Sequence, residues 1–293
     1  PQQSSIRHLH TPPCPYYTTS ETDLSRPPFD LPQDSRVVSV GVYSSRMDTR
    51  EVAQLVLPHS MDESSHDGRR LDAQIETATR ACRDLVARGY RRWYVMYSGG
   101  KDSTAALVLT LEALRGAETS VEVLYCDTQL EIPILHQFAQ AFLQFLAGRG
   151  VKTTVLTPDT EDSFWVQVIG KGYPMPHNGF RWCTARLKVR PVERYLQTQT
   201  QHESETVVVT GVRFGESDAR DLRLKLSCSR GGECGQGVWF EASGRLGLGY
   251  FSPIVVWREC DVWDFLNFVA PDWGYPTAGL SAVYHGRETR FGC

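Results

Sequence analysis

The sequence lacks any apolar run that approaches the roughly 20 residues needed for a membrane-spanning helix. Its start, from Pro1 to Ser5, also lacks the basic stretch and apolar core of a secretion signal. Neither an internal repeat nor a coiled-coil heptad is present, which argues against a repeat array or a long coiled coil. We therefore expect a soluble, cytoplasmic globular protein with no membrane partner.

The chain also has no strong excess of charge of either sign. Its 293 residues include 31 Lys and Arg against 34 Asp and Glu, which gives a formal net charge of -3. This balance argues against a protein that coats nucleic acid by bulk charge, so any site for a polyanion has to be local. With 41% hydrophobic residues, the chain can bury one large core or two modest ones.

The eight cysteines show no regular spacing. In a chain of this length, such a distribution favours metal binding or redox use in a reducing compartment over a framework of disulfides. Cys82, on the apolar face of a predicted helix at 67–88, and Cys126, in a predicted strand, are expected to be core residues. Cys14 and Cys260 receive no assignment.

The remaining pattern predicts how the chain is organised. Residues 1–35 are rich in Pro, Ser, Thr and Gln and indicate an extended arm, followed by two short strands at 37–42 and 52–57. Strands and helices then alternate, with strands expected at 94–97, 121–128, 151–156 and 207–211, and helices at 67–88, 104–114 and 133–146. This order predicts an α/β fold with a mainly parallel sheet flanked by helices, which binds ligands at the carboxyl ends of its strands. We divide the chain into an N-terminal extension at 1–62, a core at 63–225 and a cysteine-bearing segment at 226–293 that completes the core.

The chain is organised around residues 94–103, an apolar run that ends in Ser98-Gly99-Gly100-Lys101-Asp102-Ser103. The residues before the glycines suit a strand and those after them suit a helix, so the glycines lie at a strand-to-helix turn. Backbone amides at such a helix start bind anions, and we expect a solvent-facing Lys101 to add a positive charge. The spacing is not that of a Walker loop, which has four residues between its glycines. The alternative is a plain helix cap at Ser103 beside a solvated lysine.

A second distinctive stretch covers residues 163–194. Its first part, Ser-Phe-Trp-Val-Gln-Val-Ile-Gly-Lys-Gly-Tyr-Pro at 163–174, predicts a short helix ended by glycine and proline. Its second part opens a helix that carries one acid, Glu193, and the basic residues Arg181, Arg186, Lys188, Arg190 and Arg194. Such a cluster can neutralise several phosphate charges, whereas the alternative is a solvated helix face. Asp127, at the tip of the strand at 121–128, either binds a nucleotide or caps the next helix.

These segments together resemble a known family. The Ser-Gly-Gly-Lys-Asp-Ser string resembles the PP-loop of the adenine nucleotide α-hydrolases. Followed by the Phe-Trp-Val-x-x-Ile-Gly-Lys-Gly-Tyr-Pro segment and by Phe-Arg-Trp-Cys-Thr-x-Arg-Leu-Lys at 180–188, it resembles the DndC family, the sulfur-modification members of the phosphoadenosine phosphosulfate reductase superfamily. Further matches are Gly211-Val212-Arg213, Glu216-Ser217, Pro253-Ile254, Trp257, Asp261-Val262-Trp263 and Arg290-Phe291-Gly292-Cys293. The likeness covers about residues 90–293, and family members usually carry one more cysteine beyond the final Phe-Gly-Cys.

The resemblance implies the site residues and cofactors. The nucleotide would be bound by Ser98, Gly99, Gly100, Lys101, Asp102, Ser103 and Asp127, with Mg²⁺ screening the phosphates of ATP. The catalytic set, which faces the phosphates or the acceptor, would be Lys101, Asp102, Arg181, Lys188 and Arg213. An iron-sulfur cluster, of the 4Fe-4S type, would be held by Cys183 and Cys293, and we assign Cys228 and Cys234 as the other two ligands. A zinc site or no metal at all are the alternatives.

The implied activity is an ATP pyrophosphatase that adenylates a backbone phosphate oxygen of DNA, so that a sulfur nucleophile can expel AMP. Its partners would be DNA, a cysteine desulfurase as sulfur donor and other sulfur-modification proteins. Three alternatives remain: a reductase of phosphoadenylyl or adenylyl sulfate, a tRNA thiolase, and a non-catalytic nucleotide-sensing subunit of a defence complex. The segment at 163–174 argues against the reductase, and the intact Lys101 with its two glycines argues against the sensor.

Overall fold

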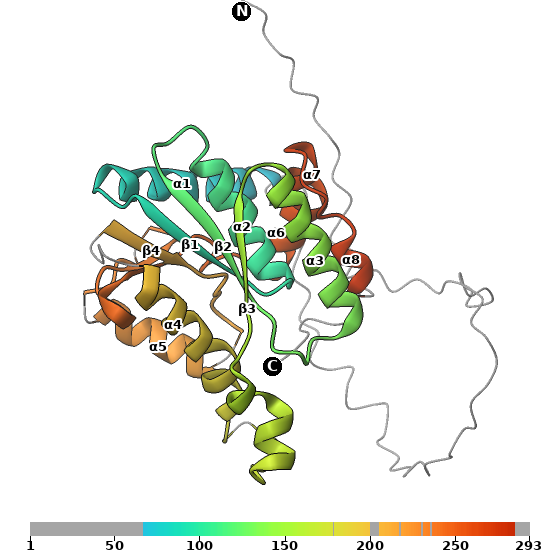
Figure 1. The fold of residues 1–293 in the computed structure, drawn as a ribbon. Helices are drawn as coiled ribbons and strands as arrows, with labels where there is room; N and C mark the ends of the chain where they lie inside the picture. The colour runs from blue at the N-terminus through green and yellow to red at the C-terminus, as the bar shows by residue number, and fades with distance from the viewer. Residues whose placement is uncertain are drawn as a thin grey trace, which may run out of the picture. The chain divides into compact units, whose positions relative to one another are not determined.

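The computed structural model describes residues 67–177, 179–199, 205–216, 218–229, 231–234 and 236–284, which belong to one compact unit (Figure 1). The arm expected at 1–35, the strands expected at 37–42 and 52–57, and Cys293 lie outside the described residues. Their predictions are therefore untested.

Within the described residues, a six-stranded sheet has the strand order β3-β2-β1-β4-β6-β5. Its strands are β1 (Arg92–Tyr97), β2 (Ser120–Cys126), β3 (Lys152–Leu156), β4 (Thr206–Val209), β5 (Trp239–Glu241) and β6 (Gly249–Ser252). All neighbouring strands pair in parallel except β5, which runs antiparallel to β6. The mainly parallel α/β sheet predicted from the sequence is confirmed.

Helices cover both faces of this sheet (Figure 1). One face carries α1 (Asp67–Ala87), α2 (Lys101–Ala113), α3 (Pro133–Gly148), α6 (Glu259–Asp264), α7 (Ala270–Asp272) and α8 (Leu280–Val283). The other face carries α4 (Arg190–Gln199) with α5 (Asp218–Ser229) beside it. Two π-helical turns, η3 (Val166–Gly170) and η4 (Thr184–Val189), lie between β3 and α4, and a third, η7 (Phe265–Val269), joins α6 to α7.

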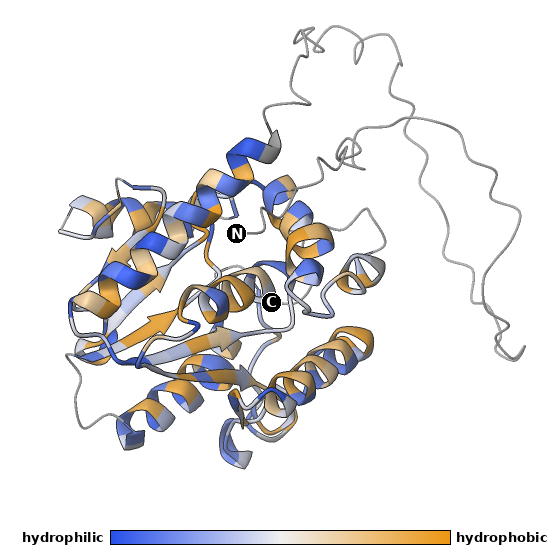
Figure 2. Cartoon of the chain, turned by 90° about the horizontal axis from the view of Figure 1, so that it is seen from above, coloured by the Kyte–Doolittle hydropathy of each residue, from blue (hydrophilic) through white to orange (hydrophobic). Residues whose placement is uncertain are grey.

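Alternate residues of the strands fill the two layers of the core. On β1, Trp93, Val95 and Tyr97 are buried on one side, while Tyr94 packs on the other side in a cluster with Leu196 of α4. The apolar sides of the helices turn towards the strands in Figure 2, and their polar sides turn outwards. Each fully buried large apolar side chain contributes about 1.5–3 kcal/mol to folding.

The strand order places a topological switch point between β1 and β4. The chain leaves β1 through α2 to reach β2 on one side, whereas β4 pairs with the opposite edge of β1. In open parallel sheets, ligands bind in the crevice outside the carboxyl ends of the strands at such a point. The Ser98–Ser103 loop directly follows β1, so it opens onto this crevice.

Several elements differ from the sequence prediction. Helix α2 begins at Lys101, three residues earlier than the 104–114 helix predicted, because the loop turns directly into the helix. The sequence also failed to predict β5 and β6, which span three and four residues and are too short for a clear alternation. Cys228, one of the cluster ligands assigned from the sequence, lies on α5 near its end.

Candidate phosphate-binding site

The loop between β1 and α2 has the backbone shape of an anion-binding turn. Gly99 has a φ of 77°, and a Cβ there would lie 2.8 Å from the Cβ of Ala139 on α3, so only glycine fits. The Ser103 hydroxyl accepts a hydrogen bond from the Ser98 amide at 3.2 Å and donates one to the Gly100 carbonyl at 2.9 Å. These contacts hold the loop against the first turn of α2, whose leading amides have no helical partner of their own.

Lys101 is buried, contrary to the solvent-facing side chain expected from the sequence. Only 2% of the residue is exposed. Its Nζ lies 3.4 Å from Asp102 Oδ2 and 3.6 Å from Glu259 Oε1, and 5.3 Å from the centroid of the Tyr284 ring. A buried ammonium needs such partners because removing an unpaired charge from water costs several kcal/mol. The sequence could not reveal the burial, since Glu259 and Tyr284 come from far along the chain.

Arg213 joins the loop after β4 to the start of α2. Its Nε donates to Asp102 Oδ1 at 2.6 Å, and its Nη1 donates to the Trp257 carbonyl at 3.2 Å. Gly211 makes the same junction tight, because a Cβ there would lie 2.7 Å from the backbone of Asp102 and Ser103. Three predicted site residues, Lys101, Asp102 and Arg213, are thus linked by direct contacts.

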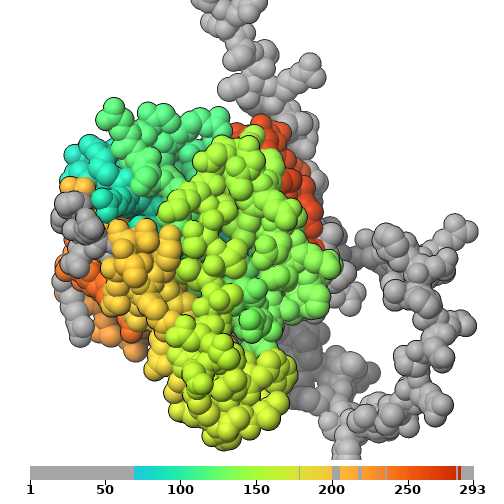
Figure 3. Space-filling view, viewed as in Figure 1, coloured from blue at the N-terminus to red at the C-terminus, as the bar shows by residue number. Residues whose placement is uncertain are grey.

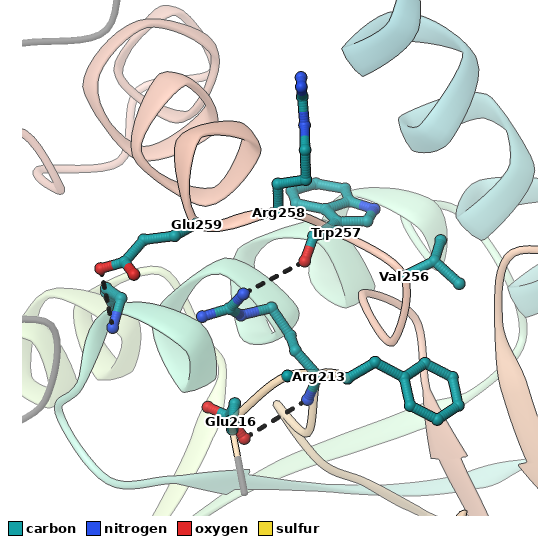
Figure 4. Close-up of a pocket in the computed structure, with 9 residues that line it drawn as sticks. Arg213, Glu216, Val256, Trp257, Arg258 and Glu259 are labelled. Atoms are coloured by element: carbon teal, nitrogen blue, oxygen red, sulfur yellow. Dashed lines mark hydrogen bonds and ion pairs between the residues drawn. The ribbon is translucent and has the colours of Figure 1, made fainter. Parts of the chain in front are cut away.

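A cavity of about 440 Å³ opens beside these groups. It is lined by Lys101, by residues 213–216 after β4 and by residues 256–259 after β6. In Figure 4, Arg213 and Glu216 face Trp257, Arg258 and Glu259 across it. The volume lies within the roughly 300–1,000 Å³ of small-molecule sites, and the cavity occupies the switch point where the fold binds ligands.

Asp127 lies at the carboxyl end of β2, next to the strand that leads into the loop. Its Oδ1 accepts a hydrogen bond from the Gln129 amide at 2.8 Å, so it shapes the turn that follows. Asp127, Glu131 and His136 bring potential metal-ligand atoms within 4.8 Å of one another, a grouping that the sequence analysis missed. Burial alone would raise the pKa of Glu131, but hydrogen bonds from Thr128 and Leu130 outweigh burial and lower it. The Asp-x-x-x-Glu spacing before α3 was the available signal.

Three members of the basic cluster form ion pairs with acids that precede the cluster in the sequence. Arg186 and Arg190 both bond to Asp162, at 2.6 and 3.0 Å, and Arg194 pairs with Asp159. Burial alone would raise the pKa of Asp162, but the hydrogen bonds from Arg190 and Arg186 outweigh it and lower the pKa. These three arginines therefore brace the segment, and they are less available for phosphate than the sequence suggested.

Lys188 and Arg181 have different surroundings. The Lys188 carbonyl accepts a hydrogen bond from Cys126 Sγ at 3.7 Å, which places Lys188 at the end of β2. Burial raises the pKa of the Cys126 thiol to about 11, although the Lys188 charge acts in the opposite direction. Arg181 is exposed on the stretch before η4. The structure thus places Lys188 near Asp127, while Arg181 lies outside the set of residues that line the cavity.

Residues 163–183 form a projecting segment with a small core of its own, drawn in yellow-green beyond β3 (Figures 1 and 3). Phe164 stacks on Trp182 with ring centroids 5.6 Å apart, and the Trp182 indole donates to the Pro174 carbonyl at 3.0 Å. These contacts join the two motifs recognised in the sequence. Trp165 and Ile169 point outwards instead, with 58% and 76% of their surfaces exposed.

The described cysteines do not assemble into one group. Cys228 and Cys234 form a disulfide with their Cα atoms 5.7 Å apart, whereas Cys183 is a free thiol buried beside Trp182 and Leu187. Two adjacent cysteines suit a pair of cluster ligands, but only in the reduced form, because thiolates are the ligands. The four-cysteine cluster therefore stays a prediction. The core assignment of Cys82 is confirmed, since it is fully buried.

Across the described residues, no helix combines the length and the apolar character needed to cross a membrane. The phosphoadenosine phosphosulfate reductase domain family matches residues 92–268, from β1 into η7, and so includes the loop and the cavity. The chain belongs to this family.

Other similarities are more distant. An uncharacterized protein of Methanocaldococcus jannaschii is 29% identical over 132 residues, which cover 45% of this chain and 25% of the relative. The chain thus spans about a quarter of the length of this curated relative.

Among solved structures, a phosphoadenylyl-sulfate reductase from Candida auris in a phosphate complex has a TM-score of 0.45 at 13% identity, covering 77% of this chain and 93% of that one. The U34-tRNA thiolase NcsA from Methanococcus maripaludis, with its [4Fe-4S] cluster, gives 0.42 at 13% identity, with coverage of 71% and 67%. An NH3-dependent NAD synthetase from Campylobacter jejuni gives 0.44 at 14%, with coverage of 73% and 77%. Similarity at this level concerns the fold alone.

Proposed function

We propose that this chain binds ATP at the Ser98–Ser103 loop and cleaves it between the α- and β-phosphates to activate a backbone phosphate of DNA for replacement by sulfur. The observation that supports ATP binding is the position of the loop. It begins α2 at the β1/β4 switch point, beside a cavity lined by Lys101 and Arg213. Membership of the reductase domain family agrees with an adenine nucleotide as the ligand.

The chemistry follows from the poor leaving ability of a phosphate oxygen. A non-bridging oxygen of DNA attacks the α-phosphorus of ATP, and the bond from that phosphorus to the oxygen bridging to the β-phosphate breaks. Pyrophosphate departs with the bonding electrons, and the DNA phosphate carries AMP. A sulfur nucleophile then forms a P–S bond and expels AMP. Negative charge grows on the pyrophosphate during the first step, where the helix amides and Lys101 would stabilise it.

Asp102 and Arg213 would hold the phosphate loop and Lys101 in place during the attack on the α-phosphorus. The hydrogen bond between them fixes the first turn of α2 against the loop after β4. The Nζ of Lys101 lies 3.4 Å from the same carboxylate, so Asp102 also orients the lysine ammonium group. Lys188 and Asp127, at the end of β2, would then contact the nucleoside side of ATP.

The DNA acceptor rests on the resemblance of the projecting segment, together with residues 184–188, to the DndC family. Its exposed Trp165 and Ile169 and the cation of Arg181 suit a nucleic-acid surface, because bases stack on aromatic rings and arginine binds phosphate. A cysteine desulfurase would supply the sulfur, and other sulfur-modification proteins would complete the assembly.

Two cofactors accompany the proposal. Mg²⁺ would screen the ATP phosphates, and the carboxylates of Asp127 and Glu131 provide the oxygen ligands that such a cation accepts. An iron-sulfur cluster would use Cys183, Cys228, Cys234 and Cys293, and when bound it would supply redox or sulfur-handling chemistry. Cys228 and Cys234 fit that role only after reduction of their disulfide.

The decisive experiment follows the fate of ATP. The protein is incubated with Mg²⁺, duplex DNA and ATP labelled on the α- or the γ-phosphate, and the products are separated. We expect AMP and pyrophosphate, formed faster when DNA and a sulfur donor are present. Release of ADP and inorganic phosphate would contradict cleavage between the α- and β-phosphates. AMP formation at the same rate with and without DNA would contradict DNA as the acceptor.

A second candidate is the reductase for which the family is named, favoured by the match over residues 92–268. Such an enzyme splits adenylyl sulfate or its 3′-phosphorylated form, and a thiol supplies two electrons to release sulfite and the nucleotide. Sulfite release from either compound in the presence of a dithiol, without ATP, would establish this function. Pyrophosphate release from ATP and sulfite release from adenylyl sulfate therefore separate the two candidates.

A further inference from the structure

The hydroxyl of Tyr284 is hydrogen-bonded to the first backbone amide of α2, at the end of the phosphate loop. Tyr284 follows α8 and is only 3% exposed, and its Oη accepts a hydrogen bond from the Lys101 backbone amide at 3.1 Å. The same oxygen would lie 3.2 Å from a Cβ placed on Gly100. The ring is held edge-on by Trp263 of α6, with centroids 5.1 Å apart. These two contacts place the tyrosine over the turn.

A phosphate on this loop would need that amide. Lys101 is the first residue of α2, so its N–H has no acceptor within the helix and points along the positive end of the helix dipole. A phosphoryl oxygen bound there requires the space that Oη now fills, at the same hydrogen-bond distance. The hydroxyl and the phosphate therefore compete for one donor.

Glu259 acts on the side chain of the same lysine. Its Oε1 lies 3.6 Å from Lys101 Nζ, and the same Nζ lies 5.3 Å from the centroid of the Tyr284 ring. Glu259 is the first residue of α6, and Tyr284 directly follows α8. One stretch of chain after β6 thus contacts both the amide and the ammonium that would receive phosphate.

We propose that Tyr284 and Glu259 form a displaceable cover on the phosphate loop, so that a phosphate ligand binds by replacing both and moves residues 280–284 away from α2. The inference rests on the proposed function only in taking this loop to be the phosphate site. It adds that nucleotide binding changes the position of α8. Because residue 100 is glycine, there is room beside it for the Tyr284 hydroxyl or for a phosphate oxygen.

The first test measures pyrophosphate affinity by calorimetry. In Tyr284→Phe the ring and its packing on Trp263 remain, but the competing hydroxyl is gone. We expect pyrophosphate to bind about three- to tenfold more tightly, the effect of one neutral hydrogen bond. Glu259→Gln should also tighten binding. The matched control is Tyr275→Phe, which removes a buried hydroxyl bonded to Glu112 at 2.7 Å, away from the loop, and should leave the affinity unchanged. Unchanged or weaker binding by Tyr284→Phe would overturn the inference.

The second test uses the unaltered protein and does not depend on the folding of a variant. Hydrogen-deuterium exchange of peptides that contain residues 277–284 should become faster when pyrophosphate is added, while the loop amides become slower. Equal or stronger protection of residues 277–284 with pyrophosphate bound would refute the displacement and leave ATP binding at the loop intact. If pyrophosphate binds neither the unaltered protein nor Tyr284→Phe, this inference and the proposed function both fail.

Discussion

Arg213 donates a hydrogen bond from Nε to Oδ1 of Asp102 at 2.6 Å, although the two residues are 111 positions apart in the sequence. Their side chains are 8% and 17% exposed, so the pair is largely shielded from water. The bond joins the first turn of α2 to the loop after β4, across the switch point of the sheet. The geometry of the phosphate loop therefore depends on a residue of a distant segment.

Removing Arg213 should destabilise the protein strongly. Arg213→Ala removes the Nε donor to the Asp102 carboxylate and the Nη1 donor to the Trp257 carbonyl, and loss of one partner of a buried ion pair costs about 3–5 kcal/mol. Urea unfolding measures the change. Arg80→Ala, which removes an exposed pair with Glu76 on α1, is the control and should cost under about 1 kcal/mol. Equal effects of the two changes would show that the Arg213 contact contributes little.

Lys101→Ala should abolish pyrophosphate release and also lower the melting temperature. The first effect follows from loss of the cation at the phosphate loop, and the second from leaving Asp102 and Glu259 close together without it. Labelled ATP and a thermal melt measure the two effects. Lys225→Ala, an exposed lysine on α5, serves as the control. Full turnover by Lys101→Ala would remove the loop from the mechanism.

Arg181 and Lys188 are expected to bind ligand, unlike Arg186 and Arg190, which pair with Asp162. Changing Arg181 or Lys188 to Ala should weaken ATP or DNA binding by about 1–3 kcal/mol each, the range of charge-assisted hydrogen bonds, with little effect on stability. Arg190→Ala should have the reverse pattern, since its bond to Asp162 braces the segment. Fluorescence anisotropy with labelled DNA and nucleotide, alongside urea unfolding, tests both. Affinities that do not change for either ligand would assign Arg181 and Lys188 to a solvated surface.

The pKa of Asp162 predicts an acid sensitivity. Burial would raise it, but the hydrogen bonds from Arg190 and Arg186 lower it below the unfolded value. The carboxylate therefore contributes stability that is fully present above the unfolded pKa of about 3.9 and is lost as pH falls through the lower folded pKa. Asp162→Asn should cost about 1–3 kcal/mol at pH 7 and less at pH 3. Unfolding free energies across this range test the sign, with the exposed Asp72→Asn as control.

Anaerobic purification should yield protein with iron and sulfide, if the cysteine assignment is correct. Cys183→Ser and Cys228→Ser should each lower the iron content, because thiolates hold such clusters. Cys82→Ser is the control, since burial raises the pKa of that thiol to about 12 and it lies on α1. The cluster assignment would be contradicted if the protein contains no iron and if Cys228 and Cys234 react with thiol reagents only after reduction. The disulfide would then be the state of these two cysteines.

The sequence predicted those helices and strands whose hydrophobic pattern lies within one continuous stretch of the chain. The apolar face of α1, the strand that enters the loop and the βαβ alternation through β3 appear within a few residues of their expected bounds. Long periodic segments give a strong signal. The strands β5 and β6 gave none, because three or four residues cannot show an alternation. They owe their state to pairing, β6 with β4 and β5 with β6.

The sequence predicted which residues belong to the phosphate-binding site, but not which residues they contact. The loop motif indicated Lys101 and Asp102, and the family likeness indicated Arg213. The burial of Lys101, its contact with Glu259 and the hydroxyl of Tyr284 over the loop depend on tertiary packing between residues more than 150 positions apart. The bracing of the basic cluster by Asp162 was missed because that acid lies before the segment in which charges were compared.

The close approach of Gly211 to the backbone of Asp102 and Ser103 has a consequence for how a ligand meets this loop. With no side chain between them, the turn after β4 lies directly against the backbone at the start of α2. The amides of the helix start are thus preorganised during folding, and little conformational entropy is left to lose when an anion arrives. A methyl group at position 211 would separate the two elements and leave a folded protein whose loop has to be ordered by each ligand it binds.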